Sequence, residues 1–258
     1  LDDGRKIEIT GKIDRVDTAI DENEKYLRIV DYKSSTKNID LNEVYAGTQL
    51  QLLTYMDAVC KEKDCIPAGV LYFSLLEQII TSDKKITEEE IEEKLRKEFK
   101  MKGLILSDVK VIHMQDKTLK TGTSKIIPAT LNKDGEIVES KTNGVNIEEF
   151  KILQSYITRT IKQIAKEILR GNIELKPYNK KGQKPCEYCS YKAICQFNPR
   201  MCGNRYNYID KKSKDDIMKQ MEQRGRNKGD VVNLFYKFCR IIAENVKIYY
   251  KGDANWKI

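Results

Sequence analysis

The sequence predicts a mixed α/β fold in which helices flank a mixed β-sheet. Residues 5–20 alternate between apolar and polar side chains, which is typical of a strand with one buried face. Residues 68–76 are nearly all apolar, as in a strand that is buried on both faces. Apolar residues then recur at helical spacing from Phe150 to Ile168, which indicates a long amphipathic helix.

The remaining elements follow from local signals. Residues 21–25 form a polar turn, so the first two strands are expected to pair as a β-hairpin. Thr87 and Glu90 form a capping box at the start of a further helix, and Gly171 suits the end of the long one. The predicted strands are 5–20, 26–33, 68–76 and a β unit within 109–140 that turns at 132–135, and the other predicted helices are 43–60, 213–225 and 230–250.

Size and charge bound the function. A chain of 258 residues can bury one sizeable core, with room for an appended subdomain. The formal net charge of +8 favours a polyanionic partner, nucleic acid first. Solvated helix faces of a lysine-rich protein explain that charge equally well.

Several classes of protein are excluded. No apolar run approaches the roughly 20 residues that span a membrane, and no signal peptide opens the chain, so we expect a cytoplasmic protein without a membrane partner. The phosphate-binding loop GxxxxGK[ST] is missing, so this segment is not expected to hydrolyse ATP. The chain begins at Leu1, close to its first strand, and we therefore expect a fragment whose upstream elements are absent.

Two carboxylates and a lysine are expected at one edge of the hairpin. Asp31 and Lys33 are two apart on a strand and so share a face, and the partner strand can bring Asp14 close to Asp31. Carboxylate oxygens are ligands that Mg²⁺ prefers, and the carbonyl of Tyr32 could complete the coordination. The metal would activate a water molecule, while the lysine orients it or stabilises charge on a phosphate. A surface salt bridge, Asp31 to Lys33 or Asp14 to Arg15, is the plainer explanation of these residues taken alone.

The surrounding strings favour the catalytic interpretation. GKIDRVD at 11–17 and IVDYKSS at 29–35 together resemble the RecB-like branch of the PD-(D/E)XK nuclease superfamily. The resemblance implies a restriction-endonuclease-like core and gives catalytic roles to Asp14, Asp31 and Lys33. Gln51 and Tyr55 match the Q-x-x-x-Y helix motif of the same branch, and their spacing of four places them on one helix face. Both could donate hydrogen bonds to a catalytic carboxylate or to DNA phosphate, although a polar stripe on a packing helix remains an alternative.

A cluster of cysteines lies after the long helix. Cys186, Cys189 and Cys195 have the spacing of metal ligands, and both zinc and an iron–sulfur cluster are chemically possible. The residues around them, PCEYCSYKAICQF, closely resemble the end of AddB-type subunits of helicase–nucleases. That resemblance implies a [4Fe–4S] cluster in the full-length parent, completed by a fourth cysteine that would lie before Leu1. Cys60 and Cys65 are expected to be ordinary core or surface thiols, whereas Cys202 could substitute as a ligand, although its spacing does not match the pattern.

The resemblance also implies an organisation and partners. Residues 1–200 would form the nuclease domain, with a core at 1–80, a β/helical insertion at 81–145, and the long helix and cysteine segment at 146–200. Residues 201–258 would form a basic helical tail. The function implied is that of a Mg²⁺- or Mn²⁺-dependent deoxyribonuclease, an exonuclease on single strands. It would act in double-strand break repair and recombination beside a helicase partner of AddA type.

Two rival functions stay open. A Cas4-like nuclease would share the RecB-like motifs and a cysteine cluster. A non-catalytic DNA-binding scaffold would keep the fold without cutting, although it would not need Asp14, Asp31 and Lys33 together. His113 is the only histidine; we place it in a strand over 109–114 and expect it to be structural.

Overall fold

A computed structural model describes residues 1, 5–76, 87–223 and 246–249 of the chain. By the contacts between its residues, the chain divides into two compact units. One unit comprises residues 13–40 and 50–154, and the other comprises 1–12, 41–49 and 155–258.

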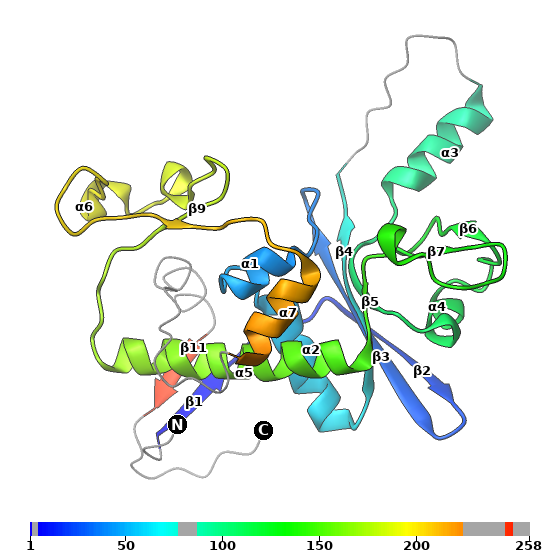
Figure 1. The fold of residues 1–258 in the computed structure, drawn as a ribbon, viewed down its shortest axis with the longest axis horizontal. Coiled ribbons are helices and arrows are strands. Elements are labelled where there is room, and N and C mark those ends of the chain that lie inside the picture. The colour runs from blue at the N-terminus through cyan, green and yellow to red at the C-terminus, as the bar shows by residue number, and fades with distance from the viewer. Residues whose placement is uncertain (2–4, 77–86, 224–245, 250–258) are drawn as a thin grey trace. The chain divides into compact units, whose positions relative to one another are not determined.

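The first unit is built on a five-stranded mixed sheet, which confirms the predicted fold class (Figure 1). Its strand order is β2-β3-β4-β5-β8, where the pairs β2–β3 and β4–β5 are antiparallel and the pairs β3–β4 and β5–β8 are parallel. The strands are β2 (Arg15–Asp21), β3 (Glu24–Lys33), β4 (Ile66–Ser74), β5 (Lys102–Leu106) and β8 (Gly144–Val145). The predicted hairpin is therefore present as β2 and β3, joined by a tight turn at Glu22, whose φ is 52°.

Helix α2 (Gln51–Lys63) lies between β3 and β4 in the chain and contacts both strands. Since β3 and β4 are parallel, α2 must run back along the sheet, and its first turn lies near the ends where β3 and β4 finish. Leu27 and Ile29 of β3 are fully buried and point to the same face as Asp31. The start of α2 therefore belongs to the same edge of the sheet as Asp31 and Lys33.

The range 81–145, which the sequence predicts as an insertion, contributes most of the core on the opposite face of the sheet. Val30 and Leu71, which are paired on β3 and β4, are buried in a cluster with residues of the insertion. The other members of this cluster are Met101, Ile105, Ile112, Leu119, Ile127, Ala129 and Leu131. The elements of the insertion are α3 (Glu88–Glu98), α4 (Val109–Gln115), β6 (Gly122–Thr123), β7 (Thr130–Leu131) and the 3₁₀ helix η1 (Glu139–Lys141).

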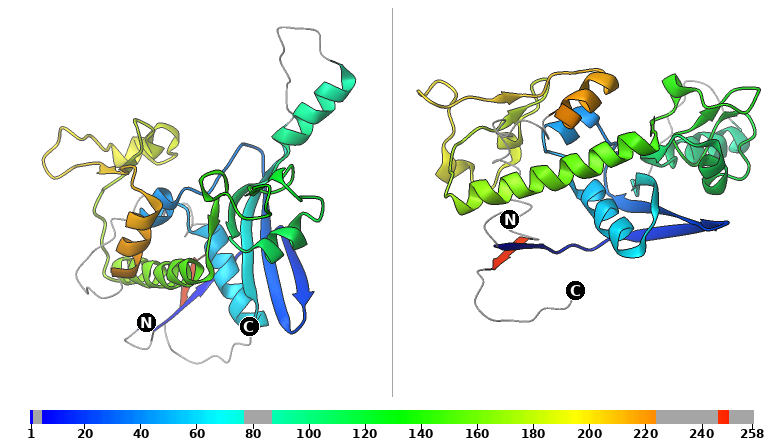
Figure 2. Two further views of the ribbon diagram at one scale, coloured as in Figure 1. Left: turned by 45° about the vertical axis from the view of Figure 1, so that its right-hand side comes forward. Right: turned by 60° about the horizontal axis from the view of Figure 1, so that its bottom comes forward.

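The second unit contains the cysteine segment and two small sheets. Tyr156 packs on Tyr45, with ring centroids 5.9 Å apart, and its hydroxyl donates to the Tyr45 carbonyl over 2.6 Å. Strand β1 (Lys6–Ile9) pairs antiparallel with β11 (Val246–Tyr249). The other elements are α1 (Leu41–Tyr45), β9 (Tyr178–Asn179), η2 (Pro185–Tyr188), α6 (Lys192–Cys195), β10 (Asn207–Tyr208) and α7 (Lys214–Gln223). Helix α5 (Ile147–Leu169) spans the boundary at residues 154–155 (Figure 2).

Several local predictions are confirmed. Thr87 and Glu90 form the reciprocal capping box at the start of α3. Gly171 has a φ of 69° directly after α5, which a glycine adopts without strain. The turn at 132–135 is also present, where Gly135 donates to the Asn132 carbonyl over 3.2 Å. Helix α7 matches the predicted helix over 213–225.

Other predictions are wrong. Residues 5–20 are two strands rather than one, because β1 pairs with β11 while β2 pairs with β3 in a different sheet. The helix predicted over 43–60 is interrupted by a turn at Gly47, whose φ is 73°. Residues 109–114 form helix α4 instead of a strand, because Asp108 caps the Val111 amide over 3.2 Å. Of the helix predicted over 230–250, residues 246–249 are strand β11, and the rest lies outside the described residues.

Candidate active site

The register of the β2–β3 hairpin sets Asp14 beside Asp31. Arg15 pairs with Val30 in this antiparallel ladder, so the residue before Arg15 falls opposite the residue after Val30. The backbone N–H of Tyr32 donates a hydrogen bond to Asp14 Oδ2 over 3.0 Å. The two carboxylates that the sequence singled out are thus brought to the same edge of the sheet.

Asp31 is a buried carboxylate beside a lysine. Its side chain is 7% exposed, and Lys33 Nζ lies 2.5 Å from its Oδ2. This contact is an ion pair without the angles of a hydrogen bond, and Oδ2 has no hydrogen-bond donor among the described residues. Lys33 is 30% exposed and extends over the Tyr72 ring, 6.0 Å from its centroid. The Asp31–Lys33 salt bridge that the sequence allowed is present, but it is buried on the Asp31 side.

The residues at this edge fit a divalent cation. Asp31 Oδ2 is a buried, negatively charged oxygen to which no described residue donates a hydrogen bond, so the ion pair with Lys33 compensates its charge while its lone pairs remain available to a metal ion. Asp14 offers a second carboxylate, and the Tyr32 carbonyl lies in the chain between Asp31 and Lys33. Two carboxylates and a carbonyl are the hard oxygen ligands that Mg²⁺ and Mn²⁺ take in proteins.

A charged network braces the other face of the hairpin. Asp17 accepts hydrogen bonds from Arg15 Nε over 2.8 Å and from Arg28 Nε over 3.0 Å. Burial by itself would raise the pKa of Asp17, but the bonds from Arg15 and Arg28 outweigh it and lower that pKa below its usual value. Arg28 also reaches Gln115 of α4 over 3.4 Å, and Gln115 donates to the Ala68 carbonyl over 3.2 Å. This network ties β2, β3, β4 and the insertion together.

Arg15 connects that network to Tyr32. Its guanidinium donates to Asp17 and lies near the Tyr32 phenol, and both neighbours raise the pKa of Arg15, with the hydrogen bond to Asp17 the larger cause. The Tyr32 ring packs edge-on against Phe73, with centroids 5.8 Å apart. The side chain of Tyr32 is therefore held on one face of the sheet while its backbone N–H binds Asp14. The sequence showed no signal for this role of Arg15 beyond its position next to Asp14.

Gln51 and Tyr55 lie on the first turns of α2, as the motif predicts. Gln51 Nε2 donates to the Tyr55 hydroxyl over 3.2 Å, so they share one helix face. Among the described side chains, Gln51 and Tyr55 bond each other, and neither forms a hydrogen bond with Asp14, Asp31 or Lys33. Their hydrogen bonding to a catalytic carboxylate or to DNA stays a prediction.

The cysteine segment holds its three candidate ligands in short turns of chain. Cys186 lies in η2, Cys189 ends that turn, and Cys195 is the last residue of α6. All three are partly buried, and no cysteine of the described residues forms a disulfide. Within the described part of the chain no three His, Cys, Asp or Glu side chains converge closely enough to hold a metal ion. The iron–sulfur cluster stays a prediction.

Three further cysteines of the described residues lie outside this segment of ligands. Cys60 is buried in α2, with its sulfur 3.3 Å from Met56 Sδ. Burial raises the pKa of its thiol to about 12, which makes it a core residue rather than a nucleophile. Cys65 is partly buried and Cys202 is exposed. His113 lies within α4 and belongs to none of the clusters described above.

The match to a known superfamily shows the family of the chain. The sequence pattern of the PD-(D/E)XK nuclease superfamily matches residues 1–196, and the chain belongs to that superfamily. The matched range includes the mixed sheet, Asp14, Asp31, Lys33 and all three cysteines of the segment.

The chain is also similar to several individual proteins. Three of them are each the AddB subunit of an ATP-dependent helicase/deoxyribonuclease. The chain is 44% identical over 230 residues to that subunit of Clostridium kluyveri, covering 87% of this chain and 20% of that protein. It is 44% identical over 229 residues to the subunit of Acetivibrio thermocellus, covering 86% of this chain and 20% of that protein. The subunit of Bacillus thuringiensis is 42% identical over 231 residues, again covering 86% and 20%. The chain thus spans about a fifth of the length of these relatives.

No helix in the described part of the chain is both long enough and apolar enough to cross a membrane.

Proposed function

We propose that this chain is the nuclease domain of an AddB-type helicase/deoxyribonuclease subunit, and that it hydrolyses phosphodiester bonds of DNA with Mg²⁺ or Mn²⁺. The observation that carries the proposal is the juxtaposition of Asp14 with Asp31 across the hairpin. The buried Asp31 oxygen, to which no described residue donates, and the neighbouring Lys33 add to it. Membership of a nuclease superfamily and the AddB relatives support the same reaction.

Some of the site residues would hold the metal, and others would act on the attacking water molecule or the phosphate. Asp14, Asp31 and the Tyr32 carbonyl would hold the metal, which when bound activates water and offsets charge on the phosphate. Lys33 is anchored by Asp31 and partly exposed, so its ammonium can orient the attacking water or stabilise the charge that builds on the phosphate. Gln51 and Tyr55 are assigned hydrogen bonds to the phosphate backbone, since both lie at the start of α2.

The proposed substrate is the end of a single DNA strand that an AddA-type helicase subunit delivers during repair of double-strand breaks and recombination. The net charge of +8 suits a substrate held mainly through its phosphates. We propose residues 1–200 as the nuclease domain, residues 201–258 as a basic tail, and the cytoplasm as the location. These assignments are supported by the names of the relatives and the extent of the match.

The test is the cleavage of linear and circular single-stranded DNA, each with Mg²⁺, with Mn²⁺ and with a chelator. An exonuclease degrades the linear strand from its ends and leaves the circle intact. Cutting of the circle would replace the exonuclease assignment by an endonuclease. Binding of both strands without cutting, at every concentration of either metal, would contradict catalysis and favour the scaffold function.

We further propose that Cys186, Cys189 and Cys195 hold a [4Fe–4S] cluster, together with a thiolate from elsewhere in the full-length parent. The spacing of the thiols and their placement in short turns support this assignment. The check is the iron and sulfide content of the full-length parent, purified without oxygen, against its Cys189→Ser variant. Equal iron in both proteins would contradict it.

A further inference from the structure

A lysine lies in line with the carboxylates across the sheet. Asp31 on β3 pairs with Tyr72 on β4, and Tyr72 pairs with Lys102 at the start of β5. Residues paired across strands point to the same face. Lys102 therefore shares the catalytic face with Asp31, two strands away and at the same level of the sheet.

The opposite face confirms this orientation of β5. Met101 and Ile105 lie in the cluster with Val30 and Leu71, and that cluster packs on the face away from Asp31. A Cβ on Gly103 would lie 2.2 Å from the Val70 carbonyl, so β5 approaches β4 as closely as a glycine allows. Alternation along β5 leaves Lys102 on the catalytic face, above the buried Leu104.

Lys100 lies close to Lys102, at the point where the chain enters β5. The ring of Phe99 stacks on Phe73, with centroids 6.1 Å apart, and Phe73 pairs with Tyr32 on the face away from Asp31. Lys100 lies between the end of α3 and the start of β5, two residues before Lys102, and so at the same edge of the sheet. The chain therefore brings two cations, two residues apart, to the edge where Asp31 lies.

The charges of these two cations are not compensated by any carboxylate of the described residues. No such carboxylate forms an ion pair with Lys100 or Lys102, whereas nearby Lys97 pairs with Glu93 over 3.3 Å. Lys100 and Lys102 are both partly buried, and burial lowers the pKa of Lys100. Burial removes part of the hydration of a cation, and an anionic ligand would compensate for that loss.

We infer that Lys100 and Lys102 form a phosphate-binding subsite for single-stranded DNA, which takes a phosphate next to the one that is cut. The inference rests on the proposed function of the chain. Neighbouring strands lie about 4.8 Å apart, so the Lys102 backbone is roughly 10 Å from that of Asp31. That spacing separates the subsite from the metal ligands and keeps both within one short segment of DNA. Lysine ammonium groups, as flexible point charges, suit a phosphate whose orientation changes as the strand moves.

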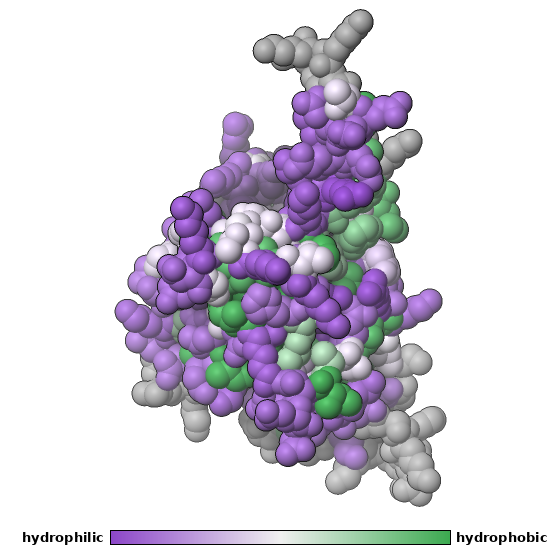
Figure 3. Space-filling model, turned by 90° about the vertical axis from the view of Figure 1, so that its right-hand side faces the viewer, coloured by the Kyte–Doolittle hydropathy of each residue, from purple (hydrophilic) through white to green (hydrophobic). Residues whose placement is uncertain are grey.

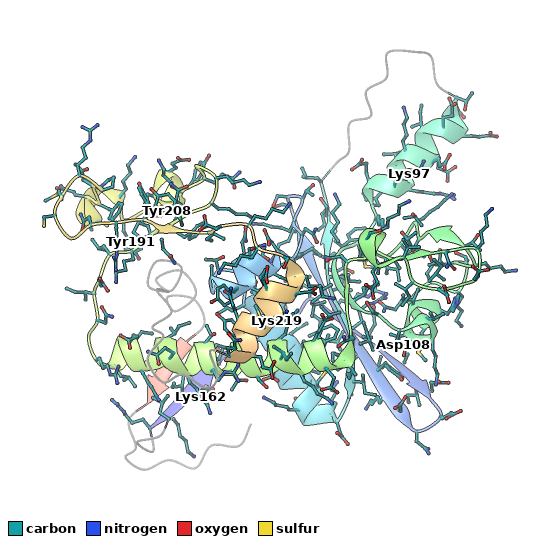
Figure 4. The ribbon with its side chains drawn as sticks, in the orientation of Figure 1. Lys97, Asp108, Lys162, Tyr191, Tyr208 and Lys219 are labelled. Carbon is teal, nitrogen blue, oxygen red and sulfur yellow. The ribbon has the colours of Figure 1, made fainter. Side chains whose placement is uncertain are left out.

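The experiment measures binding of a labelled oligothymidylate to the full chain at several salt concentrations. Ca²⁺ replaces Mg²⁺, and a gel checks that the DNA stays uncut. The test variant is the pair Lys100→Gln and Lys102→Gln. The control is the pair Lys94→Gln and Lys97→Gln on α3. These two lysines are exposed and lie a few residues before Lys100, so the control removes the same amount of charge (Figure 4 labels Lys97).

The salt dependence separates a phosphate contact from a general effect of charge. Each phosphate contact on a single strand contributes about 0.7 to the slope of log K against log salt. The test variant should lower the slope by about 1.4, which corresponds to two contacts, and the control should leave it unchanged. Lys102→Arg in place of Lys102→Gln keeps the cation and should restore the part of the salt slope that Lys102 contributes. This variant guards against a folding defect, which thermal melting also detects.

Three results would overturn the inference. Equal slopes for the wild type and the test variant would remove the subsite while leaving the proposed function intact. Equal loss in the test and control variants would show that only net charge matters. Failure of the wild type to bind at any salt concentration would instead remove the proposed function, and the subsite with it.

Discussion

The backbone N–H of Tyr32 donates to Asp14 Oδ2 over 3.0 Å. Tyr32 directly follows Asp31 in β3, so this single bond couples the carboxylate before β2 to the strand that carries the other carboxylate. The side chain of Tyr32 is held meanwhile by Arg15 and Phe73 on the opposite face. The geometry of the proposed metal site therefore depends on how residue 32 is fixed on both sides of the sheet.

Asp14→Asn should separate charge from geometry. The amide oxygen of asparagine can still accept from Tyr32, so the thermal unfolding temperature should stay close to that of the wild type. Loss of a charged metal ligand should reduce cleavage by on the order of 100-fold or more and raise the Mg²⁺ concentration needed for half-maximal rate. Cleavage rates across a Mg²⁺ titration check this, and an unchanged titration would exclude Asp14 as a ligand.

Arg15→Gln and Tyr32→Phe should weaken the site in the same way. Each removes the contact between the guanidinium and the phenol while leaving Asp14, Asp31 and Lys33 in place. Loss of such an orienting partner typically costs about 10- to 100-fold in metal affinity or activity. The readout is again the Mg²⁺ titration. Since neither change removes a proposed phosphate contact, the salt slope of DNA binding should not move; a shifted slope with normal metal dependence would assign Arg15 to DNA instead.

Lys33→Met should affect the rate more than binding. Methionine fills much of the space of the lysine stem but cannot polarise a phosphate or a water molecule. The turnover rate should fall about 10²- to 10³-fold, while the dissociation constant for single-stranded DNA, measured in Ca²⁺, changes little. Parallel losses in rate and affinity would make Lys33 a binding residue only.

Asp17→Asn should destabilise the protein in a pH-dependent way. The pKa of Asp17 is lowered in the folded state, so its contribution to stability is present above the unfolded value of about 3.9 and is lost as the pH falls through the folded value. The variant should therefore melt at a lower temperature than the wild type near pH 7. The difference should shrink below pH of about 4. A difference that is constant across this range would show that the bonds to Arg15 and Arg28 do not depend on the charge of Asp17.

Much of the site could be predicted because its signals are local. Asp31 and Lys33 lie two apart on a strand. The hairpin turn between β2 and β3 is short, so it restricts the residues that Asp14 can face on β3. The cap of α3 is likewise local to Thr87 and Glu90. These features depend on residues that are near one another in the chain.

What could not be predicted depends on pairing between distant segments. Lys102 meets Tyr72 only because β5 pairs with β4, and no pattern in either strand specifies that register. The break between β1 and β2 reflects the pairing of β1 with β11, more than two hundred residues away. Helix α4 was mistaken for a strand because its β-branched residues Val109, Val111 and Ile112 favour strands, and the cap from Asp108 decides otherwise.

Hydrophilic side chains predominate on the face that Figure 3 shows, interrupted by smaller hydrophobic patches. Charge alone does not single out Lys100 and Lys102 from the many other lysines of the chain. Their position does, at the edge of the sheet in line with Asp31, together with the lack of a counter-ion for them among the described residues.

The most direct test of the central claim is cleavage of labelled single-stranded DNA by the wild type and by Asp31→Asn, with Asp21→Asn as control. Asp21 ends the same strand pair and forms an ion pair with Lys110, far along the hairpin from Asp14. The account predicts that the wild type and Asp21→Asn cut with Mg²⁺ while Asp31→Asn, though folded, does not. Equal cutting by all three proteins would contradict it and move the active site elsewhere.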